Sequence, residues 1–357
     1  MSKRPQLRDD LVALEGYHSP QLDVEVRLNT NEAPGPPPAA FTEAFAEAAR
    51  SLEWHRYPDR AATKLRTAIA ATHGVPMANV LAANGSNEIL QTVLLGFGGP
   101  GRSCAVFEPT YAMHSQIART SGTEVIVGER GPDYALDVDE VERVVTQHQP
   151  SVTFLCSPNN PTGMVDPPGS VEGVLELVAP YGGLVVVDEA YGQFAPHSAL
   201  DLLGEDVPLV VTRTYSKTWA MAAARLGYLV GPQWLVAELD KVILPYHLDV
   251  MTQLAGTLAL DYVDEMEKRV SEIVEERGRI MAAFSGLAVE AWPSGANFIL
   301  FRPTEREGNE VWQALIDQSI LVRNFSSWPR LEGCLRLTIG TRDEDDRFLT
   351  ALTEILT

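Results

Sequence analysis

Cysteine is scarce in this sequence, which has only Cys104, Cys156 and Cys334 in 357 residues. Their odd number and wide spacing exclude a disulfide framework and a zinc-binding pattern, and favour a reducing, cytoplasmic location. Apolar runs are short, and none approaches the ~20 residues that a membrane-spanning helix needs. The first ten residues, MSKRPQLRDD, lack the apolar core of a secretion signal. We therefore expect neither export nor a membrane partner.

Positive charge is also in short supply, since 28 lysines and arginines face 48 acidic residues, for a net charge of −20. Such a surface repels phosphate backbones, so nucleic acid is not an expected partner. The remaining composition, 45% hydrophobic and 21% charged, is that of a globular protein. At roughly 150 residues per domain, the length predicts about two domains. An arginine cluster beside a cavity would be informative, because the overall field opposes anions there.

Short apolar runs alternate with helical patterns in the first two thirds of the chain. We expect strands at 104–107, 124–128, 152–156, 184–188 and 209–213. Being apolar on both faces, they predict a mostly parallel sheet covered by helices, such as those expected at 39–52, 63–74 and 171–179. A charged helical stretch follows at 252–284. Beyond Leu287, short strands and a helix at 310–318 indicate a smaller α+β unit.

Polar residues follow several of these strands, at the edge where open α/β sheets bind ligands. Lys217 comes after the run at 209–213, near Ser216 and Arg225. A lone lysine at such a place is usually a surface residue. Its amine can also form a Schiff base with an aldehyde cofactor, while the serine and the arginine bind a phosphate.

Asp188 and Asn160 also follow strands, and each has two possible roles. Asp188 could cap a helix, or anchor a cationic ring nitrogen. Tyr191, three residues later, could point into the same pocket. Asn160, between two prolines, could be an ordinary turn residue or donate to a phenolate oxygen.

The segment Gly85–Ser86–Asn87 precedes a helical run, where exposed backbone N–H groups can bind phosphate. Tyr111 follows another predicted strand, and its ring could stack on a cofactor or simply pack. By contrast, four histidines, His18, His55, His114 and His247, have no ligand-like spacing and are interpreted as ordinary polar residues.

Taken together, these residues resemble the ordered pattern of the fold-type-I pyridoxal-phosphate aminotransferases. Asn160 and Asp188 are 28 residues apart, and Asp188 and Lys217 are 29 apart. The segments LNTNEAP (28–34), HRYPDR (55–60), SPNNPTG (157–163) and LRLTIG (335–340) are similar to those of histidinol-phosphate aminotransferases, particularly the actinobacterial type. The resemblance extends from about Leu11 to the C-terminus.

The resemblance implies a large three-layer α/β/α domain at 39–265 and a small C-terminal α+β domain at 266–357. An arm at 1–38 would pack on the small domain and the substrate site. The implied cofactor is pyridoxal 5'-phosphate, held by Lys217, which then acts as base and acid. Asp188 would pair with the ring nitrogen, Asn160 and Tyr191 would hold the phenolic oxygen, and Tyr111 would stack on the ring. The rest of the implied cofactor site is Gly85, Ser86, Asn87, Thr214, Ser216 and Arg225.

A homodimer with a shared active site is also implied, because Tyr57 would reach the phosphate of the neighbouring subunit's cofactor. Arg323 and Arg336 would bind the anionic end of either substrate, the phosphate of histidinol phosphate or the carboxylate of glutamate. Tyr17 and Asn31 would lie on the substrate side. No metal is expected.

The implied reaction is amino transfer between L-histidinol phosphate and 2-oxoglutarate in L-histidine biosynthesis. Alternatives are an aromatic amino-acid aminotransferase, a pyridoxal-phosphate-dependent phospho-amino-acid decarboxylase, and a cofactor-binding protein without catalysis. The sequence departs from the family pattern in two places near the site. One is the stretch after Lys217, at Thr218–Trp219 and 222–224, and the other is the link between Arg323 and Arg336.

Overall fold

A computed structural model describes residues 4–12, 14–16 and 20–357 of the chain. Its larger sheet has seven strands in the order β2-β8-β7-β6-β5-β3-β4. Five of them, β4, β3, β5, β6 and β7, run parallel, whereas β8 is antiparallel to both of its neighbours. The bounds are β2 Val80–Ala83, β3 Ser103–Glu108, β4 Glu124–Glu129, β5 Val152–Cys156, β6 Leu184–Asp188, β7 Leu209–Thr214 and β8 Gly227–Val230.

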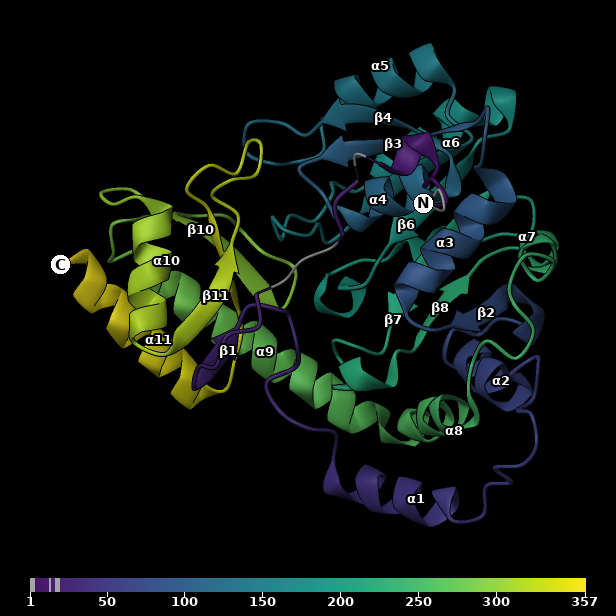
Figure 1. Cartoon of the computed structure of the whole chain (residues 1–357), viewed down its shortest axis with the longest axis horizontal. Coiled ribbons are helices and arrows are strands. Elements are labelled where there is room, and N and C mark those ends of the chain that lie inside the picture. Colours follow the sequence, from purple (N-terminus) through teal and green to yellow (C-terminus); the bar gives the residue numbers. More distant parts are fainter. Residues whose placement is uncertain (1–3, 13, 17–19) are drawn as a thin grey trace.

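The central strands are buried on both faces, which explains their unbroken apolar sequence. In β6, Leu184 and Val186 pack beneath α3 (Ser86–Phe97), α4 (Met113–Ser121) and α7 (Gln233–Leu239). Val185 and Val187 point to the other face, beneath α5 (Val138–His148) and α6 (Ser170–Val178). Because side chains alternate along a strand, each layer needs every second residue to be apolar. The expected three-layer α/β architecture is confirmed (Figure 1).

A smaller mixed sheet lies near the C-terminal end, in the order β1-β11-β12-β10-β9. Its strands are β1 Val26–Leu28, β9 Val289–Ala291, β10 Phe298–Pro303, β11 Ile320–Asn324 and β12 Leu335–Thr338. α10 (Gly308–Asp317) and α11 (Arg342–Leu356) pack on its core, and α9 (Val263–Phe284) runs from the larger part toward it (Figure 1). The first strand is formed by the N-terminal segment, which therefore joins the smaller sheet.

Some elements differ from the sequence-based expectations. The stretch at 252–284 is two helices, α8 (Val250–Ala259) and α9, separated by a short 3₁₀ turn at Leu260–Tyr262. The helices expected at 39–52 and 63–74 are α1 (Ala39–Ala49) and α2 (Thr63–Thr72). Gly74, with a φ of 64°, follows the end of α2 as a left-handed glycine should. The domain boundaries expected at 38 and 265 remain a prediction.

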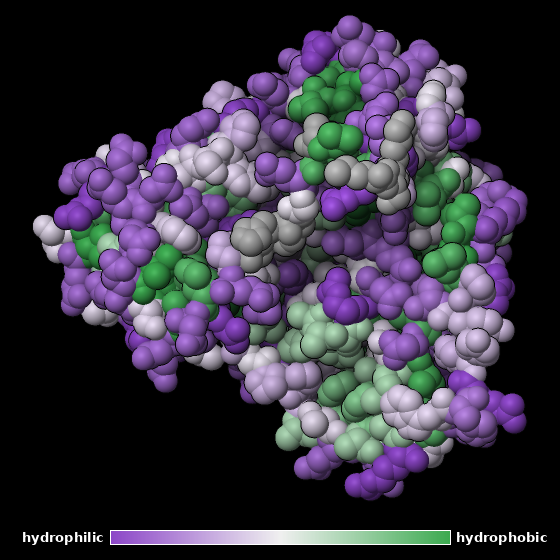
Figure 2. Space-filling model, viewed as in Figure 1, coloured by the Kyte–Doolittle hydropathy of each residue, from purple (hydrophilic) through white to green (hydrophobic). Residues whose placement is uncertain are grey.

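The surface facing the viewer in Figure 2 is mostly hydrophilic, as the charge of −20 leads one to expect. A recess lies between the C-terminal part and the larger part of the molecule (Figure 2). Within the ranges described, no helix has both the length and the apolar character to cross a membrane.

Candidate active site

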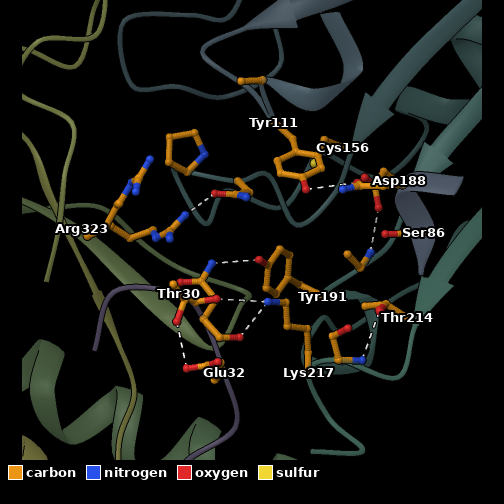
Figure 3. A pocket seen from close by; sticks show the side chains of 18 of the residues that line it. Thr30, Glu32, Ser86, Tyr111, Cys156, Asp188, Tyr191, Thr214, Lys217 and Arg323 are labelled. Atoms are coloured by element: carbon orange, nitrogen blue, oxygen red, sulfur yellow. Dashed lines mark hydrogen bonds between the residues drawn. The ribbon is translucent and has the colours of Figure 1, made fainter. Parts of the chain in front are cut away.

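A cavity of about 440 Å³ opens between the two sheets (Figure 3). The parallel strands β5, β6 and β7 end beside it, the start of α3 closes one side, and the N-terminal segment and the β11–β12 link close the other. The sequence-predicted residues that line it are Asn31, Ser86, Asn87, Tyr111, Asn160, Asp188, Tyr191, Thr214, Ser216, Lys217, Arg225, Arg323 and Arg336.

Lys217 is half-buried in this cavity, just beyond β7. Its Nζ donates to the carbonyl oxygens of Asn31, at 2.8 Å, and Thr30, at 3.3 Å. Burial, assisted by the positive charge of Arg336 and opposed by Glu32, lowers the pKa of Lys217 to about 7. A substantial neutral fraction of this amine therefore exists near neutral pH, as a nucleophile or base requires.

Asp188 ends β6, between Cys156 of β5 and Thr212 of β7 in the sheet register. Its carboxylate accepts hydrogen bonds from the backbone N–H of Ala190, at 3.0 Å, and from Thr212 Oγ1, at 3.2 Å. The other oxygen, Oδ2, lies 3.0 Å from His114 Nε2, on α4. The His114 ring stacks on Phe154 with centroids 5.0 Å apart. Interpreting His114 as an ordinary polar residue was wrong, because it is buried against Asp188 and fixes that carboxylate's orientation.

Tyr191 is buried and its ring packs edge-on against Phe298. Burial raises the pKa of Tyr191 to about 12, so its hydroxyl stays protonated at neutral pH. Asn31 Nδ2 donates to that hydroxyl at 2.8 Å. Asn31 is itself held by Thr338 and by Asn297, whose Nδ2 donates to the Asn31 carbonyl at 3.2 Å. The N-terminal segment thus supports both Tyr191 and Lys217.

The start of α3 forms a cradle with a close-fitting arginine. Gly85 precedes the helix with a φ of 80°, and a Cβ there would lie 2.7 Å from Arg225 Nη2. Arg225 Nη1 lies within 3.5 Å of Ser216 Oγ, and Ser216 N–H donates to Thr214 Oγ1 at 3.1 Å. Backbone N–H groups at a helix start, a guanidinium and a hydroxyl make a site for a phosphate.

Two residues of the predicted set have their side chains engaged by neighbours. Tyr111 donates its hydroxyl hydrogen to Asn87 Oδ1 at 3.2 Å. Asn160 accepts a hydrogen bond from Arg336 Nη1 through Oδ1, so in this structure it orients an arginine. Both remain at the cavity wall, and their predicted contacts with a cofactor stay predictions.

Two arginines stand on the side of the cavity formed by the smaller sheet. Arg336 is buried, donates to the Asn29 carbonyl at 3.1 Å, and lies between the Phe298 and Phe325 rings, 5.0 and 5.3 Å from their centroids. Arg323 lies 5.8 Å from the Phe325 centroid. β11 and β12 pair these two arginines in register. They form a planar, positively charged wall suited to a carboxylate or a phosphate.

Some predicted residues lie elsewhere. Tyr57 is 80% exposed and stacks on Tyr246, with centroids 4.6 Å apart, outside the cavity of its own chain. Tyr17 lies outside the described residues. The sequence analysis missed His114, Asn297, Phe325 and Trp328, although the unusual link between Arg323 and Arg336 contains two of them, Phe325 and Trp328.

The residues present fit an aldehyde cofactor that carries a phosphate and a ring nitrogen. The cradle at Gly85 and Arg225 suits the phosphate, Lys217 supplies the amine, and Asp188 supplies a buried carboxylate whose geometry is fixed. Tyr111 stands over the same space. No cluster of three or more metal-binding side chains occurs in the described part of the chain.

Comparisons with known proteins decide the family. A model of class I and II aminotransferases matches residues 24–352. A histidinol-phosphate aminotransferase from Frankia casuarinae is 45% identical over 363 residues, covering 98% of this chain and 90% of the relative. The chain belongs to the class I and II aminotransferase family, among the histidinol-phosphate aminotransferases. The resemblance based on the LNTNE and RYPD segments is confirmed.

Further comparisons agree with this family assignment. A histidinol-phosphate aminotransferase from Thermobifida fusca is also 45% identical, over 97% of this chain and 94% of its own. Among solved structures, the histidinol-phosphate aminotransferase from Sinorhizobium meliloti in complex with pyridoxal-5'-phosphate superposes with a TM-score of 0.90. It is 22% identical and covers 99% of this chain and 98% of its own. At that identity the likeness establishes the fold: a fold-type-I aminotransferase.

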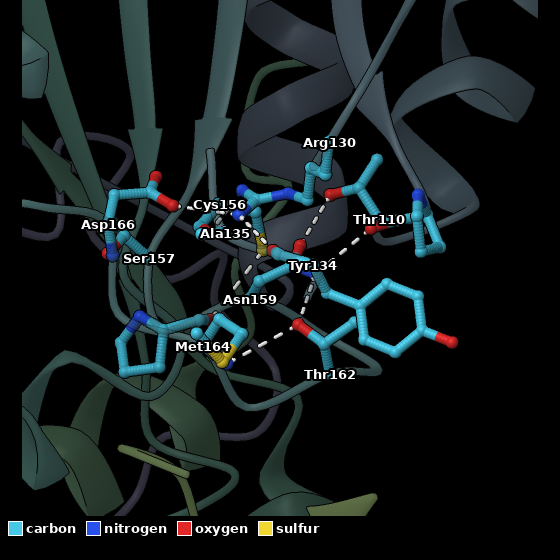
Figure 4. A network of polar contacts seen from close by, with 12 residues as sticks. Thr110, Arg130, Tyr134, Ala135, Cys156, Ser157, Asn159, Thr162, Met164 and Asp166 are labelled. Carbon is cyan, nitrogen blue, oxygen red and sulfur yellow. Dashed lines mark hydrogen bonds and ion pairs between the residues drawn. The ribbon is translucent and has the colours of Figure 1, made fainter. Parts of the chain in front are cut away.

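A buried ion pair supports the strand ends beside the aminotransferase cavity (Figure 4). Arg130 Nη1 donates to Asp166 Oδ1 at 2.8 Å and to the Tyr134 carbonyl at 3.3 Å, while Nη2 donates to the Cys156 carbonyl at 3.2 Å. Both charged side chains are almost fully buried. The pair therefore joins the loop after β4 to the end of β5.

We expect Arg130→Ala to lower the free energy of unfolding by about 3–5 kcal/mol, because it leaves the Asp166 carboxylate buried without its charge partner. Denaturant unfolding followed by tryptophan fluorescence measures the change. The matched control is Arg143→Ala, which breaks an exposed ion pair with Glu140 and should leave the midpoint unchanged. Equal midpoints for Arg130→Ala and the unmodified protein would show that the buried pair adds no stability.

Proposed function

We propose that this chain is a pyridoxal-5'-phosphate-dependent aminotransferase acting on L-histidinol phosphate in L-histidine biosynthesis, with 2-oxoglutarate as the amino acceptor. The observation that carries the proposal is the placement of Lys217, Asp188 and the Gly85–Arg225 cradle around one cavity whose opposite wall holds two arginines. The full-length relatives of 45% identity support the substrate.

When bound, the cofactor supplies an aldehyde for the amine and an electron-withdrawing ring for the carbon that loses a proton. Asp188 would pair with the ring nitrogen, and its carboxylate is held in position by His114 and Thr212. Tyr191 keeps its proton and offers it as a hydrogen-bond donor. Lys217 would take the proton from the substrate carbon and return it, as an amine with a pKa of about 7 can do near neutral pH.

One anion site serves both half-reactions in this proposal. Arg323 and Arg336 present planar guanidinium groups, whose N–H donors can bind either a phosphate or a carboxylate. Histidinol phosphate and glutamate therefore occupy the cavity in turn, each with its anionic end on this wall. The local positive charge of the two arginines draws anions into the cavity in spite of the protein's net charge of −20.

The test is the visible spectrum of the cofactor-loaded protein before and after histidinol phosphate is added alone. We expect loss of the lysine-bound cofactor band and gain of the amine form, and recovery on adding 2-oxoglutarate. A spectrum that does not change on adding histidinol phosphate but changes on adding phenylalanine would indicate an aromatic amino-acid aminotransferase. Release of carbon dioxide from a phospho-amino acid would make it a decarboxylase.

Capture of the cofactor should depend on pH through the Lys217 amine. Only the neutral amine attacks an aldehyde, so the rate should rise about tenfold per pH unit below 7 and level off above it. Mixing cofactor-free protein with pyridoxal phosphate between about pH 5.5 and 9 and following the visible band measures this rate. A free lysine titrates near 10.4. A rate still climbing at pH 9 would contradict the lowered pKa.

We also propose a homodimer in which Tyr57 serves the neighbouring subunit's cofactor. The exposed apolar group of Trp54, Tyr57, Leu244 and Tyr246, with Tyr57 80% exposed, supports a covered surface there. Sedimentation should give twice the chain mass of 39.0 kDa. Tyr57→Phe should weaken pyridoxal phosphate binding while leaving that mass unchanged, and a monomer with full activity would contradict both parts.

A cytoplasmic location is proposed as well. Three free cysteines, all buried, support it, since thiols stay reduced in that compartment.

A further inference from the structure

The link between β11 and β12 is folded on itself rather than extended. Phe325 N–H donates to the Cys334 carbonyl at 3.0 Å, closing the link at its base. Within it, Trp328 N–H donates to the Phe325 carbonyl at 2.8 Å, and Leu331 N–H donates to the Trp328 carbonyl at 3.1 Å. Successive turns of this kind fix the positions of the side chains between the two arginines.

The link is also anchored to the larger part of the molecule. Arg330 donates to the carbonyl oxygens of Glu108, Arg130 and Gly131, at 2.8, 2.6 and 2.9 Å. Tyr134 Oη returns a hydrogen bond to the Arg330 carbonyl at 2.8 Å. A buried apolar cluster lies beneath the link, formed by Tyr134, Trp292, Leu300, Phe325, Leu331 and Cys334. The link therefore has the rigidity that a specificity element needs.

Two aromatic rings of the link face the cavity beside the anion site. Phe325 and Trp328 both line it, with ring centroids 5.0 Å apart and planes at 77°. Phe325 is buried and packs against Arg336, so it belongs to the arginine wall. Trp328 is partly exposed and packs on the buried cluster. Its ring therefore adds apolar surface to the cavity beside the two guanidinium groups.

We propose that Trp328 is a specificity-determining residue that recognises the flat, unsaturated ring of the amine substrate. The inference rests on the proposed function, because Trp328 lines the cavity that holds both Lys217 and the arginine wall, where the ring-bearing branch of the substrate would lie. A ring there gains contact area and an edge-to-face or stacked arrangement. Glutamate carries no ring and gains nothing from the indole.

The test compares single half-reactions of the cofactor-loaded protein with three amines: histidinol phosphate, phenylalanine and glutamate. Trp328→Ala should lower kcat/KM for whichever ring-bearing amine the unmodified protein uses by about 10- to 100-fold, and leave the glutamate value within about threefold. Trp328→Phe should recover most of the loss. Trp234→Ala removes an exposed indole of α7, whose N–H bonds to the Glu205 carbonyl, and should change neither value.

The outcomes separate this inference from the proposed function. If the unmodified protein ignores histidinol phosphate but uses phenylalanine, the proposed substrate is wrong, and the Trp328 variants still test ring recognition. If Trp328→Ala leaves both kcat/KM values unchanged, or lowers those for the ring-bearing amine and glutamate equally, ring recognition by Trp328 is overturned. An unmodified protein that uses neither ring-bearing amine would overturn both.

Discussion

Lys217→Ala should abolish turnover, with a loss of at least about 10⁴-fold, because one amine performs both proton transfers and each such role contributes roughly 10²–10⁴-fold. The variant should also lose the visible band of the lysine-bound cofactor. The cavity itself should persist, since Asn31 and Tyr191 are held by Thr338, Asn297 and Phe298 rather than by the lysine. Stopped-flow and steady-state rates with histidinol phosphate measure the effect.

The charge of Lys217 can be separated from its chemistry by a second variant. Lys217→Arg keeps a cation near the Asn31 carbonyl but provides no amine that deprotonates near neutral pH, so it should be as inactive as alanine. Lys241→Ala removes an exposed lysine paired with Glu238 and should leave the rate unchanged. Measurable turnover in Lys217→Ala, at more than about 1% of normal, would mean that another group moves the proton.

The sequence predicted the larger sheet well, because a strand buried on both faces has an unambiguous pattern. The run Leu184–Asp188 is an example, with every residue before the aspartate apolar. Shorter or mixed elements escaped. β1, Val26–Leu28, has three residues and takes its place only through parallel pairing with β11, far along the chain. β8, Gly227–Val230, has only four residues and was not predicted.

The final helix, α11, had a readable signal that was not used. Thr341 and Glu344 form a capping box at its start, and Phe348, Leu352 and Ile355 follow at helical spacing. Local patterns of this type are available to sequence reasoning. α11 can therefore be predicted from the sequence alone.

The residues of the site also fall into those that the sequence predicts and those that it does not. Lys217, Asp188 and Asn160 were predictable because they follow strands whose carboxyl ends share one edge of the sheet. His114 was not, since it lies on α4, 74 residues before Asp188, and meets it only because β3, β5 and β6 are neighbours in the sheet. Trp328 escaped for a different reason, as its role depends on how an irregular link folds. Residues joined by tertiary packing leave no periodic signal.

Asp188→Asn should lower kcat/KM by about 10²–10³-fold, because it removes a preorganised negative charge from beside the cofactor ring while keeping the size of the side chain. The isosteric amide retains one oxygen to accept from Ala190 or Thr212, so the loss reports on charge rather than on folding. Pre-steady-state rates of the histidinol phosphate half-reaction measure it. The spectrum of the bound cofactor should shift as well, since the ring nitrogen loses its anionic partner.

A buried carboxylate that does not line the cavity provides the control. Asp345 in α11 is fully buried and accepts a hydrogen bond from the Gly340 N–H at 3.0 Å, and burial raises its pKa to about 7. Because Asp345 does not line the cavity, Asp345→Asn should change the rate by less than about threefold. His114→Ala tests the positioning of Asp188 separately, because it leaves the carboxylate but removes the ring 3.0 Å from Oδ2. If the effect of the Asp188 charge depends on how His114 orients the carboxylate, His114→Ala should reproduce part of the spectral shift of Asp188→Asn. Its loss of rate should be smaller than that of Asp188→Asn. An unaltered spectrum in both variants would mean that the ring nitrogen does not face Asp188.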